Sequence, residues 1–100
     1  MKAPEHCHSM QDLRLQIDTL DAQIVAGLAV RARYIDRAIH LKQMEKMPAR
    51  IDARVEDVVK HVRALAVAKG LDAELVDDLW RRLIDWSIAR EEQVLGPESL

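Results

Sequence analysis

The stretch between Ser9 and Pro48 contains no proline and only one glycine. Proline disfavours helical backbone at the residue before it, so a helix that starts after Ser9 should end near residues 44–46. Ser9 with Asp12 three residues further on resembles a capping box, which marks the start of a helix. We therefore predict one long helix over about residues 10–45.

A helix of this length constrains the assembly. About 35 residues extend about 52 Å at about 1.5 Å per residue, whereas a compact domain of 100 residues has a radius of gyration of about 13 Å. Such a helix must expose its apolar stripe to water or bury it against another subunit. Burial is much more favourable, so we predict an oligomer, most simply a two-fold homodimer.

The rest of the chain predicts two shorter helices. Apolar residues from Ile51 to Leu65 recur at helical spacing, and Gly70 fits the position just after a helix. Asp72 is a suitable N-cap for a third helix that continues to about Leu95. With only three glycines, three prolines and 3% aromatic residues, a β-sandwich or barrel is disfavoured. We predict an all-α fold in one domain over all 100 residues.

Composition excludes several function classes. The 15 basic and 17 acidic residues give a net charge of −2, which argues against nucleic-acid binding. No apolar run approaches the roughly 20 residues of a membrane span, and the N-terminus lacks the apolar core of a secretory signal. Cys7 is the only cysteine, so no disulfide can form within the chain. We expect a cytoplasmic protein without a membrane partner.

A metal site or a cysteine nucleophile is not expected. His6, Cys7 and His8 are neighbours whose side chains point apart, and no second ligand pair follows at zinc spacing. Cys7 also lacks an evident base to activate it. The sequence contains no glycine-rich phosphate loop, and we expect no metal and no cofactor.

Cations interrupt the apolar stripe of the first predicted helix. That stripe reads Leu13, Ile17, Leu20, Ile24, Leu28, Arg31, Ile35, Ala38 and Lys42. At about 100° per residue, Arg31 and Lys42 lie in its middle. Arg14 and Arg54 lie at the margins of the first and second helical stripes. Because an unpartnered buried cation is costly, an anionic group must meet these bases.

Two interpretations of the four bases remain open. They can pair with acidic residues of the protein such as Asp18, Asp21, Glu56 or Glu91, or extend into solvent. Alternatively, they form a pocket for a small anion that carries more than one carboxylate. Arginine binds carboxylates through two parallel hydrogen bonds, and lysine supplies a point charge.

The third predicted helix adds a polar cluster. Ser87 and Glu91 are four residues apart and share a face, beside Trp80 and Ile84. Glu91 can therefore pair with a core base. In a dry site it can instead hold a proton and donate a hydrogen bond.

A set of charged and apolar positions spread over about 80 residues resembles the all-α chorismate mutase family. It comprises Arg14-x-x-Ile17-Asp18-x-x-Asp21-x-x-Ile24, Leu28-x-x-Arg31, Lys42, Pro48, Arg54 and Ser87-x-x-x-Glu91. The isochorismate-pyruvate lyase branch is the most similar, through Met1-Lys2-x-Pro4-Glu5-x-Cys7, Tyr34 and Arg54-Val55.

The resemblance implies an intertwined homodimer of three-helix subunits with two active sites. It implies that Arg14 reaches into the partner's site and that Arg14 and Arg31 bind the two carboxylates of the substrate. Lys42 would contact a substrate carboxylate and the ether oxygen of the enolpyruvyl group. Glu91 would contact the same ether oxygen from the other side. The other expected substrate-binding residues are Arg54, Ser87, Tyr34, Ile35, Ala38, Val55, Ile84 and Ile88.

Two positions depart from the family pattern. Many mutases have a glutamate where this chain has Val55, and its loss favours the lyase. The family often has glutamine at the position of Glu91, and an ionised carboxylate would repel charge that develops on the ether oxygen. We therefore hypothesise that Glu91 works protonated, so that the rate falls as pH rises. Ser87 is mutase-like, so features of both branches are present.

The expected function is a pericyclic reaction. Isochorismate would yield salicylate and pyruvate, and chorismate would rearrange to prephenate in the same site, without a cofactor. The alternatives are a dedicated chorismate mutase, or a non-catalytic helical dimer that senses a ligand on this fold.

Overall fold

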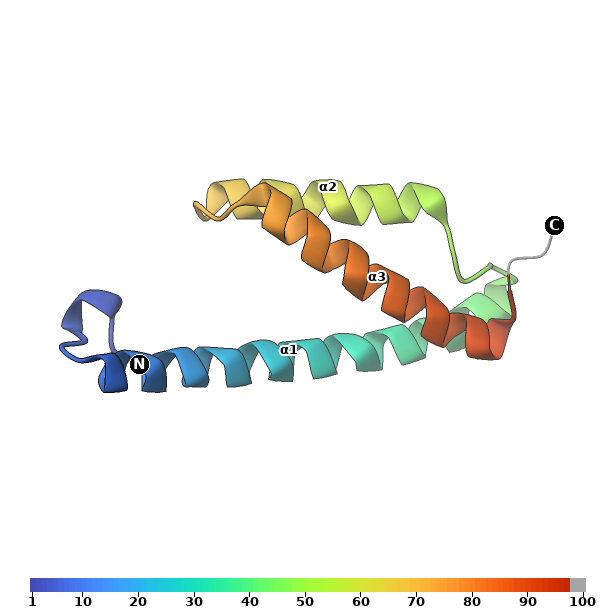
Figure 1. Ribbon diagram of the computed structural model, residues 1–100. Helices are drawn as coiled ribbons and strands as arrows, with labels where there is room; N and C mark the ends of the chain where they lie inside the picture. The colour runs from blue at the N-terminus through green and yellow to red at the C-terminus, as the bar shows by residue number, and fades with distance from the viewer. Residues whose placement is uncertain (98–100) are drawn as a thin grey trace. The chain divides into compact units, whose positions relative to one another are not determined.

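The computed structural model describes residues 1–97, and helices make up nearly all of its regular structure (Figure 1). A short 3-10 turn, η1 (Pro4–His6), is followed by α1 (Met10–Glu45), α2 (Asp52–Ala68) and α3 (Ala73–Leu95). Residues 1–97 contain no β-strand. The predicted all-α fold of three helices, with a long first helix, is confirmed.

Local signals in the sequence set the start and end of α1. The Ser9 hydroxyl oxygen accepts a hydrogen bond from the backbone N–H of Asp12 at 3.1 Å, as the predicted cap requires. The Asp12 carboxylate accepts from the Lys2 ammonium at 2.7 Å. At the other end Lys46 has a φ of 55°, a left-handed conformation that stops the helix just before Pro48.

A tight turn joins α2 to α3. Gly70 has a φ of 71°, which a residue with a side chain rarely adopts. The Gly70 N–H donates to the Val67 carbonyl at 3.1 Å and the Leu71 N–H to the Ala66 carbonyl at 2.8 Å, which is a Schellman motif. Asp72 then caps α3 by accepting from the Glu74 N–H at 2.9 Å.

The chain divides into two compact parts, residues 1–34 and residues 35–97, and α1 contributes to both. In the first part the N-terminal segment folds back on α1, where the Lys2 N–H donates to the Gln16 side chain at 3.1 Å. Ile17, Leu20 and Ile24 of the predicted stripe are 46%, 42% and 58% exposed. The apolar stripe of this part therefore remains open to solvent in the single chain.

The second part holds the core. One cluster contains Ala49, Val59, Ile84 and Ile88, with Val55, Val58 and Leu95 packed against it. A second cluster contains Val62, Ala66 and Val76, with Ala73 and Trp80 against it. Both join α2 to α3, because α2 presents valines and alanines at helical spacing to the apolar face of α3.

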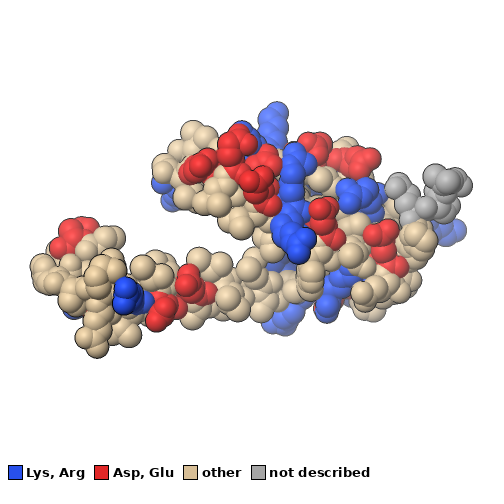
Figure 2. All heavy atoms as spheres, viewed as in Figure 1, with Lys and Arg blue, Asp and Glu red and all other residues tan. Residues whose placement is uncertain are grey.

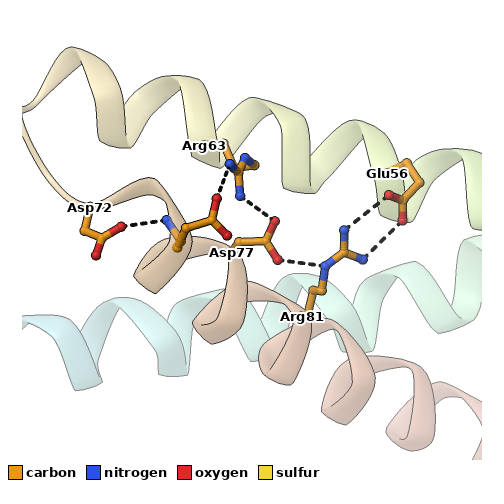
Figure 3. Close-up of polar contacts among 6 residues, drawn as sticks. Glu56, Arg63, Asp72, Asp77 and Arg81 are labelled. Atoms are coloured by element: carbon orange, nitrogen blue, oxygen red, sulfur yellow. Dashed lines mark hydrogen bonds and ion pairs between the residues drawn. The ribbon is translucent and has the colours of Figure 1, made fainter.

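Charged side chains of both signs are mixed over the surface of α2 and α3 (Figure 2). Five of them form what we call the charge ladder: Glu56, Arg81, Asp77, Arg63 and Glu74 (Figure 3). The Asp77 carboxylate is shared by Arg81 at 2.8 Å and Arg63 at 2.9 Å. These two guanidinium groups hold the pKa of Asp77 below its usual value. The charge ladder ties α2 to α3 on their solvent side.

None of the helices within residues 1–97 combines the length and the apolar character that crossing a membrane requires.

Candidate functional site

Lys42 and Glu91 form an ion pair inside the second part. The Lys42 Nζ lies 2.5 Å from the Glu91 Oε1, and the two side chains are 18% and 5% exposed. The ammonium also donates to the Ala49 carbonyl oxygen at 2.7 Å. Two of the three N–H groups of the lysine ammonium thus donate to oxygens of the described residues. The ion pair is largely shielded from solvent.

Helical spacing explains why Glu91 points inward. Ile84, Ser87, Ile88 and Glu91 recur every three or four residues on α3, and all four are buried. The Ser87 hydroxyl donates to the Leu83 carbonyl at 2.9 Å. The face of α3 that forms the core therefore continues into the polar cluster predicted from the sequence.

Three apolar residues predicted to bind substrate lie together. Ile84 and Ile88 belong to the core cluster that contains Ala49, and Val55 packs against it. Val55 and Ile84 also line an open cavity of about 230 Å³, whose remaining lining is Arg50, Asp52, Glu56, Arg81 and Asp85. This cavity is open to solvent and reaches Val55 and Ile84 at the edge of the first core cluster.

The other predicted residues lie elsewhere. Arg14, Arg31 and Tyr34 belong to the first part, where Arg14 and Tyr34 are exposed and Arg31 is half-buried. Ile35 and Ala38, half-buried, begin the second part on α1. Arg54 is exposed on α2. The second part therefore unites Lys42 with the predicted residues of α3, and the first part carries the two arginines expected on α1.

The structure also shows an ion pair that sequence reasoning missed. Arg90 of α3 donates to Asp36 of α1 through two parallel hydrogen bonds, Nε to Oδ1 at 2.5 Å and Nη2 to Oδ2 at 3.0 Å. The guanidinium also lies 5.3 Å from the centre of the Trp86 ring. Both charges lie outside the apolar stripes, so periodicity alone gave no signal for them.

The ion pair between Lys42 and Glu91 bears on the two interpretations of the inward bases. Pairing of Glu91 with a core base was the structural alternative, and the single chain adopts it. The same pairing keeps an ammonium oriented in a dry site, which is also what recognition of an anion requires. Whether Glu91 works protonated stays a prediction.

The histidines and the cysteine of the N-terminal segment take no part in this cluster. Within residues 1–97, no group of three or more His, Cys, Asp or Glu side chains is placed to hold a metal ion. The Cys7 thiol is half-buried and donates to the Ala3 carbonyl at 3.8 Å.

Comparison with known proteins places these residues in a family. Residues 13–92 match the family described as Chorismate mutase type II. An isochorismate pyruvate lyase of Pseudomonas aeruginosa is 36% identical over 92 residues, which cover 91% of this chain and 89% of that protein. A T-protein of Haemophilus influenzae is 28% identical over 85 residues, 85% of this chain but only 22% of that protein. Because the family match runs from before Arg14 to beyond Glu91, this chain belongs to the chorismate mutase type II family.

Proposed function

We propose that the protein is a pericyclic enzyme that acts on isochorismate, which it converts to salicylate and pyruvate. We propose further that it rearranges chorismate to prephenate in the same site. The observation that carries this proposal is the half-buried Lys42 ammonium, held by the buried Glu91 and by the carbonyl of Ala49, which packs with apolar residues of α3.

The chemistry suits such a group. In both reactions the ether C–O bond of the enolpyruvyl arm breaks, and negative charge builds on its oxygen. An ammonium that is already oriented in a site of low dielectric stabilises that charge without reorganising. No covalent intermediate and no general base are required, so the remaining task is to hold the enolpyruvyl arm over the ring.

The apolar residues would supply that shape. Val55, Ile84 and Ile88 belong to or pack against the core cluster of Ala49, whose carbonyl accepts from Lys42, and Ile35 and Ala38 precede Lys42 on α1. In this proposal Ser87 and Arg54 provide further polar contacts. The two carboxylates of the substrate would be bound by Arg31 and Arg14, through paired hydrogen bonds.

We further propose that the working form is an intertwined homodimer in which Arg14 serves the partner's site. The first part of the chain supports this, because Ile17, Leu20 and Ile24 line one face of a helix and are exposed. Met10 to Tyr34 of α1 form 25 helical residues, about 37 Å long at about 1.5 Å per residue, without a second α-helix in that part. A second copy would bury this stripe and complete each site.

The lyase is favoured over a dedicated mutase by Val55, which cannot hydrogen-bond a ring hydroxyl, and by the name of the 36% identical relative. Ser87, a mutase-like feature, keeps the dedicated mutase as the second candidate. The single free thiol in the described chain is compatible with the cytoplasm as the compartment.

Separate incubations with isochorismate and chorismate test the proposal. Salicylate fluorescence reports the lyase, and loss of chorismate absorbance reports the mutase. We expect turnover of both. Turnover of chorismate alone would establish the dedicated mutase, and turnover of neither would overturn the enzyme in favour of a ligand sensor or a structural dimer.

A further inference from the structure

Two ion pairs join α3 to the last turns of α1, where the two helices cross (Figure 1). One is Lys42 with Glu91, and the other is Asp36 with Arg90. The pairs use neighbouring residues on α3 but are six residues apart on α1. Ile39, buried at 7% exposure, lies between them on α1.

Two attachments constrain a crossing more than one does. A single ion pair lets α1 roll about its axis, because the flexible lysine side chain can follow its partner. A second attachment about 9 Å along the helix, six residues at about 1.5 Å each, fixes that rotation. The planar guanidinium of Arg90 is suited to this, since both of its hydrogen bonds to the Asp36 carboxylate form only in one orientation.

A neighbouring aromatic ring also restricts the orientation of the Arg90 guanidinium. Trp86 lies one turn earlier on α3, and its ring lies under the guanidinium at 5.3 Å. The hydrogen bond from Arg90 also holds the pKa of Asp36 below its usual value, so this carboxylate is charged at neutral pH.

We propose that the Asp36–Arg90 pair is a positioning clamp, which sets the rotation of α1 so that the Lys42 ammonium faces Glu91 and the substrate. Its consequence for catalysis rests on the function proposed above. Its consequence for the Lys42–Glu91 pair does not, because that pair is made by side chains of the protein alone.

A test without substrate uses urea unfolding at one fixed protein concentration. Asp36→Asn, Glu91→Gln and the double variant form one cycle. If the clamp positions the pair, the double variant lowers the urea midpoint by less than the sum of the two single decreases. Asp77→Asn replaces Asp36→Asn in a control cycle, because it removes an aspartate from the charge ladder, and this cycle should be additive. Additive behaviour in the first cycle would overturn the proposal.

A kinetic test uses the same variants. Asp36→Asn should lower kcat by on the order of tenfold with a smaller change in KM, because a misaligned Lys42 ammonium stabilises the transition state less well while substrate binding changes little. Asp36→Glu should restore part of kcat, and Asp77→Asn should leave kcat within about twofold. An unchanged kcat in Asp36→Asn, in an active wild type, would overturn the clamp.

The two failures are distinguishable. A wild-type protein without turnover refutes the proposed function, and the urea cycles still decide whether Asp36 and Arg90 position Lys42.

Discussion

The charge ladder on the solvent side of α2 and α3 and the Lys42–Glu91 pair use the same kinds of groups in different surroundings. The ladder links five side chains, of which the outer two, Glu56 and Glu74, are 65% and 75% exposed, while the central Asp77 is 16% exposed. The Lys42–Glu91 pair is single, and Glu91 is only 5% exposed. One region spreads charge over the surface, whereas the other concentrates one pair in the core.

This difference separates stability from function. Exposed pairs are screened by water and salt, so each of them contributes little. A buried pair brings a desolvation cost that apolar residues of similar size would not incur. A functional role of the ammonium therefore explains the lysine at this position better than a contribution to the free energy of unfolding does.

The largest expected effect on stability follows from breaking the buried pair. Lys42→Met leaves the Glu91 carboxylate without its cation and should lower the free energy of unfolding by about 3–5 kcal/mol. The double variant Lys42→Met/Glu91→Met should recover most of this loss, because it removes both charges. Urea unfolding measures all three proteins, and a double variant less stable than the single one would contradict the account.

The next effect concerns activity and contrasts Arg31 with an arginine of the ladder. Arg31→Ala should lower kcat/KM by about 10²–10³-fold, since a charged hydrogen bond to a substrate carboxylate contributes roughly 3–4 kcal/mol. Arg63→Ala, the matched control, should leave kcat/KM within a few fold. Circular dichroism and sedimentation check that both variants remain folded with the same mass. Equal losses in both variants would refute a specific role for Arg31.

A smaller effect tests the state of Glu91. If Glu91 works protonated, the wild-type rate falls as pH rises, whereas Glu91→Gln keeps a hydrogen-bond donor and shows a flat profile. The measurement is kcat/KM for both proteins from about pH 5 to about pH 9. Parallel profiles would show that the proton on Glu91 has no part in the reaction.

The smallest effect belongs to the charge ladder. The pKa of Asp77 is lowered in the folded protein, so its contribution is fully present above the usual value of 3.8 and is lost as pH falls through the lowered value. Asp77→Asn should therefore lower the urea midpoint slightly at about pH 7, where this contribution is present, and should flatten the dependence of the midpoint on pH below about pH 4. An undiminished acid sensitivity in this variant would mean that other carboxylates dominate.

Much of the fold was predictable because its signals are local. Pro48, Gly70 and Asp72 mark helix ends through backbone conformation and capping, which need no knowledge of the rest of the chain. The inward direction of Lys42 and Glu91 followed from helical spacing in the same way, and in the structure Glu91 is buried whereas Lys42 is half-buried.

The contacts between helices were not predictable. Asp36 and Arg90 are 54 residues apart and lie off the apolar stripes, so only the crossing of α1 and α3 brings them together. Asp77 and Arg63 likewise meet through the packing of α2 on α3. Arg14 illustrates a different limit, since the site expected for it belongs to a second subunit.

The most direct test of the central claim is the turnover of isochorismate and chorismate by Lys42→Met/Glu91→Met. The account predicts a folded protein of nearly wild-type stability whose kcat/KM is lower by at least about 10²-fold, the loss expected from removing one preorganised charge. A double variant that retains wild-type turnover of both substrates would show that the buried pair serves the fold and not the reaction.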